Sequence, residues 1–322
     1  MIATKSKLEG FKTDLEKIPS ALRTRIQNVT VKLSGLSGAF KATGVILTRD
    51  DSRVYVLTAL HNVYVLARKP NAPKWDDRLV TDFKEKVKIY YGAHDYGSEP
   101  ANPAEITAAK PIHLESATTK WEYDILLLTS ETAAFRTYAA TAGNAVYPSF
   151  PAEDSFVKEA WQYLGKGEDK TPSIFVQTGY GNVKTEIPDR RRGKRQVFPA
   201  DTTTKNKGTN VEGKLQYRIA EPESAETTSV YRQVEGENYE EYNHCIVLPA
   251  DGNDSTESGD SGGPLFVAHY ITSPKGYKLD LIGITLGADM EKSKTPCPTD
   301  PAVRVNNLAT SLDHFYEAGL PR

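Results

Sequence analysis

The sequence has little cysteine, no long apolar run and no excess of charge of one sign. Only two cysteines, Cys245 and Cys297, occur among the 322 residues, so no disulfide framework braces the fold. We favour two reduced thiols, with a single bridge between them as the alternative. No stretch approaches the roughly 20 consecutive apolar residues that a membrane-spanning helix needs, so we expect no membrane partner.

The charge balance argues against a nucleic-acid partner. The formal net charge is -2 at pH 7, which leaves no overall field that would attract a polyanion. The basic run Arg190–Arg195 could be a nucleic-acid patch or a solvated loop. No aromatic residues interleave with its basic ones, so we interpret it as a loop.

The N-terminus lacks the apolar segment of a secretory signal, because Glu9, Asp14 and Glu16 interrupt it. We therefore expect a cytoplasmic protein, or a secreted one if a leader is absent from this sequence. The scarcity of cysteine favours the cytoplasm, which is a reducing compartment.

The apolar pattern changes near residue 28. Before it, Leu8, Phe11, Leu15, Ile18 and Leu22 recur every three or four residues, which predicts a helical extension over residues 1–25 that Pro19 interrupts. After it, short apolar or alternating runs end at turn signals, which predicts an all-β protein with a first unit over 26–150 and a second over 151–322. The expected strands are 29–33, 45–47, 54–57, 87–91, 112–114, 125–128, 174–178, 215–219, 230–234, 246–248, 265–270, 279–286 and 303–305. We further expect helices near 153–163 and 308–320, and long surface insertions at 68–85 and 186–213.

The segment Gly259-Asp260-Ser261-Gly262-Gly263-Pro264-Leu265 carries the strongest chemical signal. A serine hydroxyl is a poor nucleophile at neutral pH, so it needs a base and a site for the oxyanion. Flanking glycines let the backbone turn tightly. The N–H groups of Gly259 and Ser261 could then bind the oxygen of a tetrahedral intermediate.

Two further segments offer a base and an acid. His61 follows an apolar strand in Leu57-Thr58-Ala59-Leu60-His61, and none of the other five histidines has a comparable setting. Asp124 opens the apolar run Asp124-Ile125-Leu126-Leu127-Leu128. The order His, Asp, Ser is that of the chymotrypsin triad.

These three segments resemble the boxes of the chymotrypsin/trypsin family of serine proteases. Thr58-Ala59-Leu60-His61 resembles its histidine box, Asp124–Leu127 its aspartate box, and Gly259–Leu265 is identical to its serine box. Gly179-Tyr180-Gly181 is similar to a motif near the start of the second barrel, and Gly283–Gly287 to the strand that pairs with substrate. The resemblance covers about residues 26–320.

The resemblance implies two perpendicular six-stranded antiparallel β-barrels with a C-terminal helix and the active site between them. It implies a serine endopeptidase in which Ser261 is the nucleophile, His61 the general base and Asp124 the residue that orients His61. No metal or organic cofactor is expected. The expected partner is a protein or peptide substrate, and we allow for a regulatory protein partner.

The pocket for the substrate side chain is expected at Asp254 or Ser255, with Thr285, Gly287 and Ala302 also binding substrate. Asp254 at the base would select Arg or Lys through a charge-assisted bond, whereas Ser255 would leave an apolar pocket narrowed by Ala302. We favour cleavage after Arg or Lys.

The sequence also departs from the family. Asn62 replaces a cysteine after the histidine, Glu257 or Ser258 stands where another is expected, and the Ile-Val-Gly-Gly start of activated members is missing. We predict that Asp260 is buried and needs a cationic partner. The partner would be an internal Arg or Lys, with Ile26 opening the first strand, or else an Ile26 amine released by cleavage after Arg25.

Two other classes of protein fit part of the pattern. The string Gly-x-Ser-x-Gly also occurs in α/β-hydrolases, but there a helix follows the serine and the acid and histidine lie downstream. A non-catalytic binding protein on a chymotrypsin-like scaffold is the main alternative.

Overall fold

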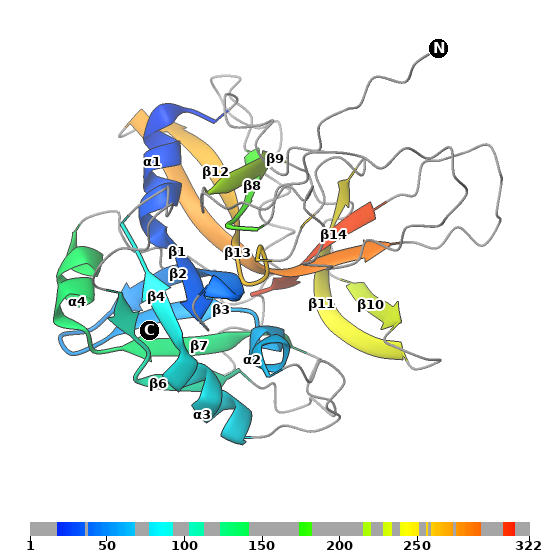
Figure 1. Cartoon of the computed structure of the whole chain (residues 1–322). Coiled ribbons are helices and arrows are strands. Elements are labelled where there is room, and N and C mark those ends of the chain that lie inside the picture. The colour runs from blue at the N-terminus through cyan, green and yellow to red at the C-terminus, as the bar shows by residue number, and fades with distance from the viewer. Residues whose placement is uncertain are drawn as a thin grey trace, which may run out of the picture.

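The protein is built from two antiparallel β-sheets. The computed structural model describes residues 18–35, 38–67, 77–92, 103–112, 123–141, 174–181, 215–219, 228–233, 239–250, 256, 259–272, 275–290 and 305–312. Within them, seven strands form each sheet, in the orders β5-β4-β1-β2-β3-β7-β6 and β10-β11-β14-β13-β12-β8-β9. Both sheets are visibly curled (Figure 1). The expectation of an all-β protein is thus confirmed, with seven described strands in each sheet where six were expected.

The first sheet comes from the first half of the chain. Its strands are β1 Thr30–Gly35, β2 Phe40–Arg49, β3 Val54–Thr58, β4 Val87–Tyr90, β5 Ala104–Glu105, β6 Ala108–Pro111 and β7 Leu126–Ser130. The second sheet comes from the second half. Its strands are β8 Ile174–Gly179, β9 Gln216–Ile219, β10 Thr228–Gln233, β11 Tyr239–Ala250, β12 Pro264–Thr272, β13 Lys275–Met290 and β14 Val305–Ser311.

Apolar side chains of both sheets meet in a central core, and each sheet has a second core on its other face. Neighbouring residues of a strand point to opposite faces. In β2, Val45 therefore lies in the central core and Ile46 in the outer core of the first sheet. In β12, Phe266 lies in the central core and Leu265 in the outer core of the second. Burial on both faces explains why these strands are continuous apolar runs in the sequence.

Helix α1 (Ser20–Val29) packs into the central core and bridges the two sheets. It begins directly after Pro19, which has no N–H to lose at a helix start. Its buried face includes Leu22 and Ile26, and Figure 1 shows it beside β12 and β13. Ile26 is 0% exposed, so the expectation that it opens the first strand is wrong: the helix continues to Val29, and β1 begins at Thr30. Residues 1–17 of the expected helical extension lie outside the described residues.

Three further helices flank the first sheet. They are α2 His61–Leu66, α3 Asp77–Lys86 and α4 Ala133–Ala140. The expectation that 68–85 is a surface insertion is wrong for its second part, because α3 buries Leu79 and Phe83 in the outer core. Leu79 and Phe83 are four residues apart, which is a helical spacing between charged neighbours.

The C-terminal prediction also needs correction. The helix expected from 308 does not begin there, because β14 continues to Ser311 between β11 and β13. Pairing on both sides satisfies the backbone of this segment as a strand and outweighs its weak helical pattern. The strand expected at 112–114 does not include Ile112, because β6 ends at Pro111; residues 113 and 114 lie outside the described residues. Residues 313–322, 153–163 and 186–213 lie outside the described residues.

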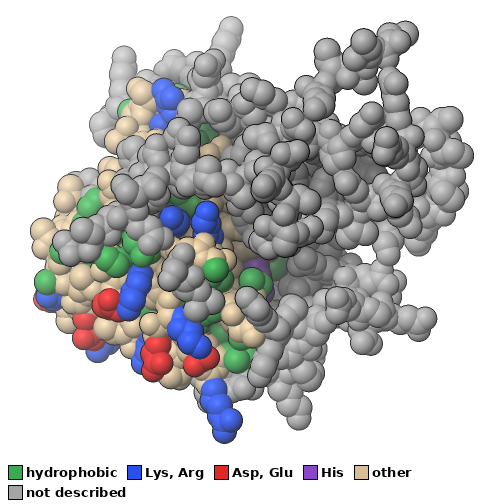
Figure 2. Space-filling view, in the orientation of Figure 1, with side chains coloured by type: hydrophobic (Ala, Val, Ile, Leu, Met, Phe, Trp, Pro, Cys, Tyr) green, Lys and Arg blue, Asp and Glu red, His purple; other side chains and the backbone are tan. Residues whose placement is uncertain are grey.

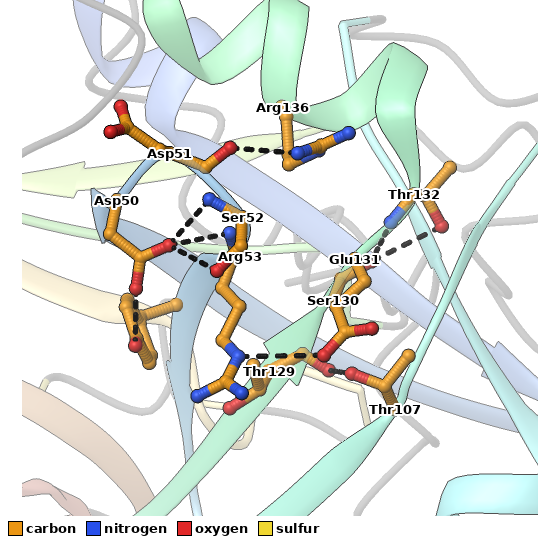
Figure 3. Close-up of polar contacts among 11 residues, drawn as sticks. Asp50, Asp51, Ser52, Arg53, Thr107, Thr129, Ser130, Glu131, Thr132 and Arg136 are labelled. Carbon is orange, nitrogen blue, oxygen red and sulfur yellow. Dashed lines mark hydrogen bonds and ion pairs between the residues drawn. The ribbon is translucent and has the colours of Figure 1, made fainter.

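A polar network joins the β2–β3 turn to α4 (Figure 3). Asp50 accepts hydrogen bonds from the backbone N–H of Ser52 and of Arg53, each at 2.7 Å, and from the Tyr55 hydroxyl at 2.8 Å. Arg136 of α4 donates to the backbone carbonyl of Asp51 at 2.7 Å. These bonds fix the turn that connects two central strands of the first sheet.

Candidate active site

His61 and Asp124 form a doubly hydrogen-bonded pair at one end of the first sheet. His61 is the first residue of α2, just after β3, and Asp124 lies just before the neighbouring strand β7. Asp124 Oδ1 accepts the backbone N–H of His61 at 2.7 Å, and Asp124 Oδ2 lies 2.6 Å from His61 Nδ1. The first N–H groups of a helix have no partner within it, so the carboxylate satisfies one of them.

The pair is shielded from solvent. The Asp124 side chain is 0% exposed and that of His61 14%. An ionised carboxylate only accepts hydrogen bonds, so His61 Nδ1 must carry a proton and donate it. In the neutral imidazole, Nε2 is then left as an acceptor. This assignment follows from the hydrogen-bond network and gives Nε2 the form that a general base requires.

Ser261 lies in a tight turn at the start of β12. Gly259 and Gly262 have φ angles of 104° and 85°, which favour glycine over residues with a side chain. A Cβ on Gly262 would collide with Thr58 Oγ1 and the Thr43 carbonyl oxygen. Glycine at this position therefore lets the serine turn of the second sheet approach the backbone of the first.

The serine turn is bonded to the segment that carries His61. The Ser261 carbonyl oxygen accepts hydrogen bonds from the Thr43 N–H at 3.0 Å and from Asn62 Nδ2 at 3.3 Å. Asn62 is the residue directly after His61, so the segments that carry the expected nucleophile and the expected base are in contact. Among the described residues, no hydrogen bond joins Ser261 Oγ to the His61 ring; such contacts often tighten only when substrate binds.

Asp260 lies beneath the turn and is 4% exposed, so its predicted burial is confirmed. Its Oδ1 accepts the N–H of Gly181 at 2.7 Å. A Cβ on either Gly179 or Gly181 would collide with this carboxylate. The Asp260 carboxylate therefore packs directly against the backbone of Gly179-Tyr180-Gly181, and both glycines are needed to leave room for it.

Strand β13 adjoins the turn on its other side. The Thr285 carbonyl accepts the Gly262 N–H at 2.8 Å, and the Thr285 N–H donates to the Gly263 carbonyl at 2.7 Å. The Thr285 side chain accepts a hydrogen bond from Gln177 Nε2 at 2.9 Å, and both residues are 0% exposed. This internal bond occupies a side chain that we expected to bind substrate.

Gly287 has a φ angle of 153°, and no described atom lies within 4 Å of the position of a Cβ. Within the described residues, the space beside Gly287 is therefore open to the backbone of a bound peptide, as expected for a substrate-binding residue. Asp254, Ser255 and Ala302 lie outside the described residues.

Thr43, Gln177 and the role of Asn62 were missed by sequence reasoning. Thr43 lies 216 residues before its partner Gly259, and nothing in the local pattern of β2 distinguishes it from other buried threonines. From the sequence, Asn62 stood out only because it occupies a position where a cysteine was expected. Its amide was the available signal, because an amide can form hydrogen bonds, as Nδ2 does with the Ser261 carbonyl.

A scan against protein-family models and a search of curated proteins both find no match. Within the described part of the chain, no helix is long and apolar enough to cross a membrane. The same residues contain no cluster of three or more His, Cys, Asp or Glu side chains arranged to hold a metal ion.

Proposed function

We propose that this protein is a serine endopeptidase of the chymotrypsin/trypsin type, acting through Ser261, His61 and Asp124. The observation that carries the proposal is the buried Asp124–His61 pair at 2.6 Å, joined through Asn62 and Thr43 to the glycine-rich turn of Ser261. The two antiparallel sheets are compatible with the two six-stranded barrels of that family. Assignment of the sheets to this fold is part of the proposal.

The proposed reaction begins when Ser261 Oγ attacks the scissile carbonyl carbon and His61 Nε2 takes the hydroxyl proton. Asp124 stabilises the imidazolium that forms. The carbonyl oxygen becomes an oxyanion, for which the N–H groups of Gly259 and Ser261 are the proposed donors. His61 then protonates the leaving amine as the C–N bond breaks, and a water molecule resolves the acyl-enzyme by the same steps.

The proposed substrates are proteins or peptides, in the cytoplasm unless a leader precedes this sequence. Cleavage after Arg or Lys is favoured if Asp254 forms the base of the pocket, and after apolar residues if Ser255 does. On the face of the molecule shown in Figure 2, Lys/Arg and Asp/Glu side chains of the described residues are interspersed. Exposed charges of the described residues also pair directly, as in the Lys86–Asp82 contact at 2.7 Å.

An active-site-directed fluorophosphonate tests the proposal. We expect the wild-type protein to be labelled at Ser261 and to cleave a peptide panel that varies the residue before the scissile bond. Ser261→Ala should lose labelling and lower turnover by about 10⁴-fold or more, because triad members act as a unit.

Ser20→Ala is a suitable control, since Ser20 is exposed at the start of α1 and should keep wild-type labelling. A wild-type protein that is folded but inert towards both reagents would favour the alternative, a binding protein on the same scaffold. Equal turnover by the wild type and Ser261→Ala would exclude Ser261 as the nucleophile.

A further inference from the structure

Every polar group of Thr43 forms a hydrogen bond, and its N–H and Oγ1 contact the serine turn. Its N–H donates to the Ser261 carbonyl at 3.0 Å, and its Oγ1 donates to the Gly259 carbonyl at 2.7 Å. Its Oγ1 also accepts the Tyr180 N–H at 2.9 Å, and its carbonyl accepts the Thr58 hydroxyl at 2.7 Å. Thr43 is 0% exposed, so water does not compete for these bonds.

Asn62, in helix α2 beside the first sheet, has the second side chain that reaches the turn. Its Nδ2 donates to Thr58 Oγ1 at 3.0 Å and to the Ser261 carbonyl at 3.3 Å. Asn62 is 2% exposed and Thr58 is 0% exposed. We call Thr43, Thr58 and Asn62 the serine-turn clamp.

The clamp and two backbone bonds fix three successive peptide planes. The plane after Gly259 is held through its carbonyl by Thr43 Oγ1. The plane after Asp260 is held by the Gly263 N–H at 2.8 Å. The plane after Ser261 is held by Thr43, Asn62 and, through the Gly262 N–H, the Thr285 carbonyl.

This anchoring determines where the Ser261 N–H points. In a trans peptide the N–H and C=O point in opposite directions. The Ser261 N–H shares its plane with the Asp260 carbonyl, and the planes on both sides cannot turn without breaking a buried bond of the clamp. Oxyanion donors act because they are aligned before the reaction begins, and a shift of about 1 Å can cost roughly 100-fold in rate.

We infer that Thr43 is a positioning residue for catalysis, with Asn62 as its auxiliary: the clamp aligns the Ser261 turn from across the interface between the two sheets. Neither side chain is expected to touch substrate. The inference rests on the proposed function and adds to it a requirement on the first sheet that is independent of His61 and Asp124.

The test compares Thr43→Val with Thr43→Ser. Valine keeps the shape of threonine but removes Oγ1, whereas serine retains it. We expect Thr43→Val to lower kcat by about 10- to 100-fold with KM within about threefold of the wild type, and Thr43→Ser to restore kcat to within about threefold. Labelling by the fluorophosphonate should slow in parallel with kcat, because that adduct is also tetrahedral.

Thr30→Val is the matched control. Thr30 is also 0% exposed, but it does not contact the turn. Thr30→Val loses one buried bond, from Oγ1 to the Ile26 carbonyl at 2.7 Å, where Thr43→Val loses the two bonds of its Oγ1. Thermal unfolding of all variants is measured beside the kinetics. Thr30→Val should lower the melting temperature and leave kcat unchanged, which separates positioning from loss of stability.

Four outcomes overturn the inference. Wild-type kcat in Thr43→Val does so alone, as does an equal loss in Thr43→Ser and Thr43→Val. If Thr43→Val does not unfold cooperatively, Asn62→Leu replaces it, and kcat that falls less than about threefold in that variant rejects the clamp. A wild-type protein that is neither labelled nor active rejects the proposed function itself, and the inference with it.

Discussion

Asp124→Asn is expected to abolish most activity by changing the tautomer of His61 while leaving the fold intact. The Asp124 carboxylate has two partners, the His61 backbone N–H at 2.7 Å and His61 Nδ1 at 2.6 Å. The backbone N–H can only donate, so the amide oxygen of Asn must face it. The amide NH₂ group then faces Nδ1, which must become an acceptor, and the ring proton moves to Nε2.

The size of the effect follows from that proton. A protonated Nε2 in a neutral ring cannot take the Ser261 proton, and the corresponding change in a triad of this kind lowers kcat about 10⁴-fold. This factor is equivalent to about 5.5 kcal/mol of barrier. The carboxamide has nearly the shape of the carboxylate, so we expect no comparable loss of folding stability.

Two measurements check this reasoning. Steady-state kinetics give the loss of kcat/KM, and ¹⁵N NMR of the His61 ring reports which nitrogen carries the proton in the neutral state. Asp280→Asn is a control, because Asp280 is 8% exposed in β13 and pairs with Lys278 at 3.2 Å. Wild-type kcat/KM in Asp124→Asn, or a proton still on Nδ1, would refute the argument.

Two further predictions concern stability. Gly181→Ala should lower the free energy of unfolding in urea by about 1–3 kcal/mol, the usual range for overpacking, because its Cβ would meet the Asp260 carboxylate; an unchanged unfolding midpoint would mean that Asp260 is free to move. Hydrogen bonds from Tyr55 and then from the Ser52 backbone lower the pKa of Asp50 from 3.8 to about 2, so the stability that its ionised form contributes is fully present above pH 4 and is lost as the pH falls through about 2. Solvent screening keeps this contribution below about 1 kcal/mol. The free energy of unfolding should therefore be lower at pH 2 than at pH 5, and Asp50→Asn should remove the part of that difference that is due to this turn.

The sequence by itself determined the class of the fold, because buried strands appear in it as short apolar runs. Runs such as Val54–Leu57 and Ile174–Val176 have apolar residues on both faces, and β3 and β8 lie there. The local pattern gave the wrong element where contacts between distant segments outweighed it. Residues 308–311 belong to the segment 308–320, whose pattern predicts a helix, but they lie between two strands. Helix α3 lies in the segment 68–85, which was expected to be a surface insertion.

The candidate site divides in the same way. His61, Asp124 and Ser261 each lie in a short segment whose residue types indicate their chemistry, so sequence alone could nominate them. Only the tertiary structure decided what surrounds them. Thr43 lies 216 residues from Gly259, Asn62 lies 199 from Ser261, and Gly181 lies 79 from Asp260. Contacts between residues so far apart depend on how two sheets pack and leave no pattern in either segment alone, because each partner needs only a common residue type at a position that the packing of the whole chain selects.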